Sequence, residues 1–113
     1  MKKLTLLTSV LLLCTLSAFA TEQTWKNVPL IDVNCSTKAK ADSDAHTRGC
    51  ALQCQRSGFG ILAPDGTFLK FDAQGDRTAL EALQKTKKTD HLRVTVTGDR
   101  DGNTIKVKSL ALS

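Results

Sequence analysis

The chain has 113 residues, of which 41% are hydrophobic and 24% are charged, and its formal net charge is +5. This length is sufficient for one domain and excludes two. Basic and acidic residues are interspersed along the chain, a distribution that argues against a basic surface for nucleic acid or for a membrane.

Residues 1–20 have the three parts of a secretory signal peptide. Lys2 and Lys3 form the charged start, and residues 4–16 form an apolar run that is too short to span a membrane. Small residues precede a cleavage point after Ala20. The sequence therefore predicts a periplasmic or secreted protein, with no membrane attachment once the signal peptide has been cleaved.

Cleavage would leave residues 21–113 as a single domain, and Cys14 would leave with the signal peptide. Loss of two lysines reduces the basic residues from 16 to 14 against 11 acidic ones, which gives a net charge of +3. A domain of this size has a small core, so a covalent or metal cross-link would help to stabilise it.

The first predicted element is a strand over residues 24–33, in which apolar and polar residues alternate. Pro29 cannot donate a hydrogen bond to a neighbouring strand, so we expect the strand to be interrupted or kinked there. Trp25 is expected to pack against the core.

A polar loop and a short helix are predicted next, in the connection between the first and second strands. The helix is expected over residues 44–57, capped by Asp42 or Ser43 and ended by Gly58. Gly49 disfavours a regular helix in its first half. In a continuous helix His46, Cys50 and Cys54 would lie along one face, because they are four residues apart.

The remaining elements follow from turn residues and periodicity. Pro64-Asp65-Gly66 between two short apolar runs predicts a β-hairpin. A helix capped by Asp76 and a closing pair of alternating strands come after it. The predicted ranges are 59–63 and 67–71 for the hairpin strands, 77–85 for the helix, 91–98 and 104–112 for the closing strands, and 99–103 for their turn.

Five strands with a helix between the third and the fourth is the order of elements in an OB-fold. The closing strands resemble those of small bacterial periplasmic OB-like domains. The pattern from Trp25 through Ile31-Asp32 to Cys35, followed by His46-x3-Cys50-Ala51-x2-Cys54-x3-Gly58-x-Gly60, is similar to small secreted bacterial proteins of uncharacterised function. The resemblance implies a mostly β fold for residues 21–113: a five-stranded OB-like barrel with one helix between strands 3 and 4 and an extra short helix between strands 1 and 2.

The chain lacks the aromatic surface of OB domains that bind nucleic acids. Such domains stack bases on exposed aromatic rings, whereas residues 21–113 contain no tyrosine and only Trp25, Phe59, Phe68 and Phe71 as aromatic residues. No nucleic-acid partner is therefore expected.

The cysteines that remain after cleavage are Cys35, Cys50 and Cys54, an odd number in an oxidising compartment. A disulfide would join Cys35 to either Cys50 or Cys54, because Cys50 and Cys54 are poorly directed toward each other within a regular helix. Closing a loop of about 15–20 residues would stabilise the domain by roughly 3 kcal/mol. The third thiol would be free, bound to a ligand, or bridged to a second copy in a dimer.

A metal site is the alternative use of the same residues. Cys35, His46, Cys50 and Cys54 offer three sulfur atoms and one imidazole, a set that suits Cu(I) or Zn(II). This hypothesis accounts for the odd cysteine and the histidine together.

The sequence favours a non-enzymatic binding or interaction module, with ligand and partner not identified and a disulfide in its cysteine segment. An exported copper- or zinc-binding protein is the alternative. Thiol–disulfide exchange is the enzymatic reading that fits best, but redox enzymes usually carry their cysteines two residues apart at a helix N-terminus. We therefore assign no catalytic residue.

Overall fold

The computed structural model of the protein describes residues 21–113. The predicted signal peptide and Cys14 lie outside the described residues. Within them, none of the helices combines the length and the apolar character needed to cross a bilayer.

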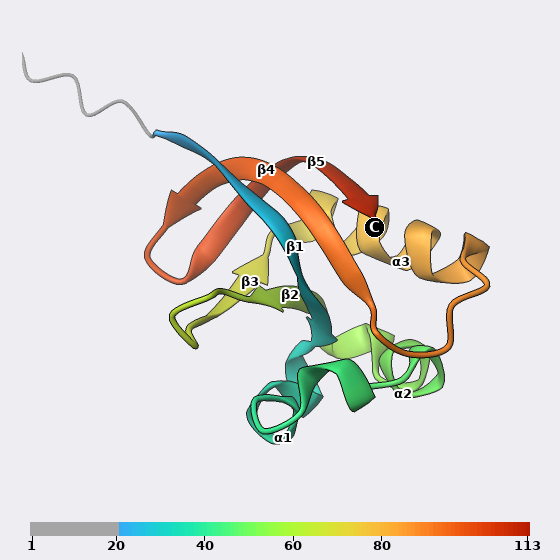
Figure 1. Ribbon diagram of the computed structural model, residues 1–113. Helices are drawn as coiled ribbons and strands as arrows, with labels where there is room; N and C mark the ends of the chain where they lie inside the picture. Colours follow the sequence, from blue (N-terminus) through green and yellow to red (C-terminus); the bar gives the residue numbers. More distant parts are fainter. Residues whose placement is uncertain (1–20) are drawn as a thin grey trace, which may run out of the picture.

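Five strands form a closed barrel in the order β1-β2-β3-β5-β4 (Figure 1). All neighbouring strands are antiparallel except β3 and β5, which are parallel and close the barrel through two residue pairs. The barrel and its helical additions confirm the predicted OB-like fold class. The strands are β1 (Glu22–Asp32), β2 (Phe59–Leu62), β3 (Phe68–Phe71), β4 (Arg93–Asp101) and β5 (Thr104–Leu112).

The core consists of the inward-facing residues of the alternating strands. In β4, Val94 and Val96 are fully buried, while the residues that alternate with them, Arg93, Thr95 and Thr97, are half-exposed. Trp25 is half-buried and packs against this core, as predicted. The largest buried side chains include Phe59, Phe71, Leu30, Ile31, Ile61, Leu69, Leu83, Leu92 and Ile105.

The irregularity of β1 lies before Pro29 rather than at it. The register with β4 shifts between Trp25 and Val28, and Asn27 has a positive φ of 50°. Pro29 itself is paired with Arg93. The predicted kink is therefore a β-bulge that bends the strand without using the proline.

Helix α3 (Ala73–Lys85) begins earlier than predicted, because Asp72 and not Asp76 is its N-cap. The Asp72 carboxylate accepts a hydrogen bond from the backbone N–H of Gly75 at 2.9 Å. Asp76 lies in the first turn and accepts one from the N–H of Phe59 at 2.8 Å. The last hairpin also differs from prediction, since β4 continues to Asp101.

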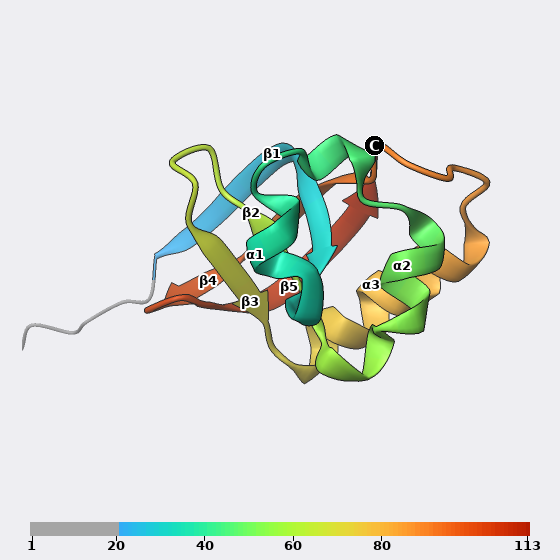
Figure 2. The ribbon, with the colours of Figure 1, turned by 90° about the horizontal axis from the view of Figure 1, so that it is seen from below.

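Residues 33–58, which we call the cysteine insertion, connect β1 to β2 and lie at one end of the barrel beside α3 (Figure 2). The predicted helix over residues 44–57 is wrong in its first half. His46 has extended backbone, and the regular helix begins only after the Thr47 cap. The insertion contains three 3-10 turns, Val33–Cys35, Ser43–Ala45 and Gln55–Ser57, and the short helices α1 (Ser36–Ala39) and α2 (Arg48–Gln53).

Candidate functional site

Asp32 ends β1 at the point where the chain leaves the barrel. It is paired with Phe59 across the β1–β2 ladder, and it is fully buried. Its Oδ2 accepts a hydrogen bond from the backbone N–H of Cys35 at 3.0 Å and thereby caps the first turn of the cysteine insertion. A buried carboxylate is costly unless it is paired or coordinates a metal, so the surroundings of the other oxygen of Asp32 matter.

That oxygen, Oδ1, lies 2.7 Å from Nε2 of His46, whose side chain is only 7% exposed. Both atoms are buried, and neither has a partner with regular hydrogen-bond angles among the described residues. The contact has the distance of an ion pair between a carboxylate and an imidazolium. A zinc ion lies about 2.0–2.2 Å from nitrogen and oxygen ligands, so a metal ion bound to both atoms would replace this contact and move the two side chains apart.

His46 reaches Asp32 because contacts to the β4 side of the molecule hold its segment in place. Arg93 donates two hydrogen bonds to the Asp44 carboxylate, at 3.0 and 3.1 Å. The backbone N–H of His91 bonds to the carbonyl of Asp44 at 3.0 Å. The guanidinium of Arg93 also holds the pKa of the Asp44 carboxyl below its usual value, so this tether is an ion pair at neutral pH.

On the other side of His46, Arg48 fixes the start of α2. Its backbone N–H bonds to the carbonyl of Thr89 at 2.8 Å. Its Nε donates to the carbonyl of Leu83 at 2.6 Å, near the C-terminus of α3, where a positive charge is favourable. His46 is therefore held between two anchored neighbours, Asp44 and Arg48.

Cys35 brings a sulfur to the same place. One ligand atom each from Asp32, Cys35 and His46 lie within 4.8 Å of one another, and we call these residues the Asp32–Cys35–His46 cluster. Burial raises the pKa of the Cys35 thiol, and the nearby Asp32 carboxylate and Cys54 thiol raise it further. The thiol form is thus favoured until a cation is present to offset the Asp32 charge.

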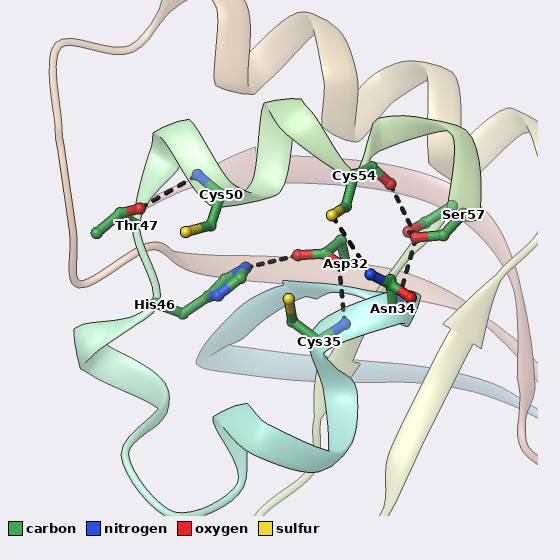
Figure 3. A network of polar contacts seen from close by, with 9 residues as sticks. Asp32, Asn34, Cys35, His46, Thr47, Cys50, Cys54 and Ser57 are labelled. Carbon is green, nitrogen blue, oxygen red and sulfur yellow. Dashed lines mark hydrogen bonds and ion pairs between the residues drawn. The ribbon is translucent and has the colours of Figure 1, made fainter.

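Cys50 and Cys54 border the cluster from α2 (Figure 3). Cys54 accepts a hydrogen bond on its sulfur from Nδ2 of Asn34 at 3.5 Å. Cys50 is exposed and lines a surface cavity of about 450 Å³ together with Cys35 and His46. All three cysteines of the described residues are free thiols in the structure.

The structure thus joins two of the four predicted ligands, Cys35 and His46, in one compact group and leaves Cys50 and Cys54 at its edge. The third member, Asp32, was missed by sequence reasoning. The sequence feature that could have drawn attention to Asp32 is its position three residues before Cys35. An aspartate at this spacing often caps a helical turn by accepting a hydrogen bond from the backbone N–H of the later residue. His91, the other histidine, is exposed and pairs with Asp90 at 3.0 Å.

The three ligand types of the cluster suit a borderline metal ion. Carboxylate oxygen, thiolate sulfur and imidazole nitrogen are all ligands of Zn(II), and three protein ligands leave its fourth position open. Cu(I) prefers a site richer in sulfur. The presence of Asp32 therefore shifts the expected preference from copper toward zinc.

No protein-family model matches the chain, and neither a search of curated proteins nor one of solved structures finds a significant match. Assignment of a function therefore rests on the chemistry of the cluster.

Proposed function

We propose that this protein is an exported binding module whose ligand is a transition-metal ion, with Zn(II) the best fit. The OB-like barrel is its scaffold, and Asp32, Cys35 and His46 are its ligands. The observation that carries the proposal is the convergence of these three ligand atoms within 4.8 Å of one another at the buried carboxylate of Asp32.

Two features of the cluster support a bound cation rather than a purely structural pair. Asp32 Oδ1 and His46 Nε2 are buried and lie 2.7 Å apart without regular hydrogen-bond angles, whereas buried polar groups are almost always well hydrogen-bonded. The Cys35 thiol adds a third ligand that an Asp–His ion pair does not need.

The cavity of about 450 Å³ beside Cys35 and His46 supplies a route to the cluster from solvent. Cys50 lies on this cavity and is exposed, so its sulfur or a water molecule is suited to be the fourth ligand. Of the cluster, Cys35 and His46 line this cavity, whereas the buried Asp32 does not.

The test is a zinc titration of the reduced, exported protein in competition with a chromophoric chelator. We expect one Zn(II) per chain. Co(II) as a spectroscopic substitute should give a tetrahedral d–d spectrum with a thiolate charge-transfer band, because the ligand set contains sulfur.

Two histidine variants make a matched pair for this titration. Loss of the outer-sphere partner of a ligand typically costs about 10–100-fold in metal affinity, so loss of the ligand in His46→Ala should cost at least about 100-fold. His91→Asn removes the exposed imidazole, keeps the backbone N–H that bonds to Asp44, and suits the positive φ of 48° at this position, so it should leave the affinity unchanged. Equal affinities of the two variants, or no stoichiometric binding by the wild type, would refute the proposed function.

A further inference from the structure

Cys35 belongs to two groupings at once. Its sulfur is a member of the Asp32–Cys35–His46 cluster, and it also faces the sulfur of Cys54 (Figure 3). Figure 3 shows the sulfur of Cys54 on the α2 side facing that of Cys35 on the β1 side. The two thiols therefore face each other within the cysteine insertion, from its first turn and from the end of α2.

Contacts that do not involve Cys35 keep Cys54 in this position. Asn34 donates to its sulfur at 3.5 Å, and the hydroxyl of Ser57 donates to its carbonyl at 2.8 Å. The same hydroxyl accepts a bond from the backbone N–H of Asn34 at 3.1 Å. The residue beside Cys35 in the chain is thus bonded to Cys54 both directly and through Ser57, which keeps the two cysteines close together.

We propose that Cys35 and Cys54 form a reversible disulfide that excludes a metal ion from the Asp32–Cys35–His46 cluster. One sulfur atom cannot be both a thiolate ligand and half of a disulfide. The protein would then exist in a reduced form that binds metal and an oxidised form that does not. The disulfide part stands on the thiol geometry alone, and the metal part rests on the proposed function.

The chemistry requires an oxidant, and a low-molecular-weight disulfide such as glutathione disulfide supplies it. One protein thiolate attacks a sulfur of the oxidant and releases one thiol, and the second protein thiolate then attacks the mixed disulfide and releases another. Two protein thiols lose two protons and two electrons, and one oxidant molecule becomes two thiols. In the metal-bound form the Cys35–metal bond must break before the sulfur–sulfur bond forms, so bound metal should slow the oxidation.

This pairing also assigns the odd cysteine. Cys50 is exposed and lies on the cavity beside His46, and Cys50 and Cys54 are poorly directed for a bridge within one helical turn. Cys50 is therefore the thiol left free when Cys35 and Cys54 are joined.

The exported protein is equilibrated with glutathione redox buffers, with and without Zn(II). Free thiols are then alkylated and the bridged peptides identified by mass spectrometry, and Zn(II) affinity is measured on the oxidised and the re-reduced protein. We expect a Cys35–Cys54 bridge with Cys50 alkylated, a loss of Zn(II) affinity of at least about 100-fold on oxidation, and full recovery on reduction.

Cys50→Ser and the double variant Cys50→Ser/Cys54→Ser make the matched comparison. The single variant should lose zinc on oxidation, whereas the double variant, in which Cys35 has no partner thiol, should keep its zinc affinity in the same buffer. A bridge between Cys35 and Cys50, or an oxidised Cys35–Cys54 protein that still binds zinc as tightly as the reduced one, would overturn the proposal. A Cys35–Cys54 bridge in a protein whose reduced form never binds zinc would instead refute the proposed function and leave only the disulfide.

Discussion

Oδ1 of Asp32 lies 2.7 Å from Nε2 of His46, and the two residues come from different parts of the architecture. Asp32 is the last residue of a barrel strand, whereas His46 lies in the cysteine insertion and is held there through Asp44 and Arg48. The cluster therefore forms only when the insertion is docked on the barrel. Changes at the docking contacts should affect it as much as changes at the ligands.

Replacement of Asp32 by asparagine should separate its two roles. Asparagine caps a helical turn about as well as aspartate, so the turn that begins the insertion should persist. The loss of the negative charge should lower Zn(II) affinity by at least about 10-fold. The metal-free protein should keep its fold, because the asparagine side chain is nearly the same shape and can still accept from the N–H of Cys35 and contact His46. Zinc titration and thermal unfolding measure the two effects, with exposed Asp101→Asn as the control; an unchanged zinc affinity in Asp32→Asn would show that the carboxylate is not a ligand.

Arg48→Ala should loosen the insertion from α3. The Arg48 guanidinium donates to the carbonyl of Leu83 at 2.6 Å, and hydrogen bonds that involve a charged group contribute about 1.5–3 kcal/mol. We expect a loss of about 2 kcal/mol in the free energy of unfolding, together with faster amide exchange in α2. Arg56→Ala, at an exposed arginine just after α2, should change neither; if the two variants behave alike, the Arg48 contact does not anchor the insertion.

Two glycine variants should have opposite effects on stability. A Cβ at Gly75 would lie 2.5 Å from Cγ2 of Val107 and 2.7 Å from Cβ of Phe71, whereas a Cβ at Gly49 would have Thr47 Oγ1 at 3.9 Å as its nearest neighbour. Gly75→Ala should therefore cost about 1–3 kcal/mol through overpacking of the seam between β3 and β5. Gly49→Ala should raise stability by up to about 1 kcal/mol, since alanine is the better helix former in α2. Chemical denaturation of both variants measures the difference. A Gly75→Ala variant as stable as the wild type would contradict the close packing of α3 on that seam.

The tether between Asp44 and Arg93 predicts a pH dependence. The pKa of Asp44 is lower in the folded protein than its ordinary value of 3.8, chiefly because Arg93 bonds to its carboxylate. A depressed pKa means that the stabilisation is present above the unfolded value and is lost as the pH falls through the folded one. The wild type should exceed Asp44→Asn in stability at neutral pH, and the difference should shrink as the pH falls below about 3.8. A difference that stays constant down to strongly acidic pH would show that the ion pair contributes nothing.

The order of the barrel elements could be predicted because each element is specified by residues close together in the sequence. Alternation in β4 and β5 and the Pro64-Asp65-Gly66 turn each specify a strand or a hairpin from a few neighbouring residues. The start of α3 was misplaced since Asp72 and Asp76 are both good caps by type. The structure decides between them: the backbone N–H of Gly75 donates to the carboxylate of Asp72, whereas the carboxylate of Asp76 accepts from the backbone N–H of Phe59.

The site itself could be predicted only in part. The residue types in the segment pointed to a metal or a disulfide, but a helix of six residues leaves too little periodicity to fix which side chains share a face. The position of His46 depends on Arg93, His91 and Thr89, which lie far away in sequence. The sequence places Asp32 in the first strand, but its burial follows from the pairing with Phe59, which the sequence does not specify.

Asp32 and Phe59, the residues that flank the cysteine insertion, are direct partners across the β1–β2 ladder. The chain thus leaves the barrel and returns to it at one point, as in a hairpin whose loop has been enlarged. Because loop-closure entropy rises only slowly with loop length, such a site can accept segments of different size and content at little cost to the barrel. The replacement of the insertion by another segment is limited by Ala51, which is fully buried in the core cluster. A shorter or different segment would have to cover the surface on which Ala51 packs.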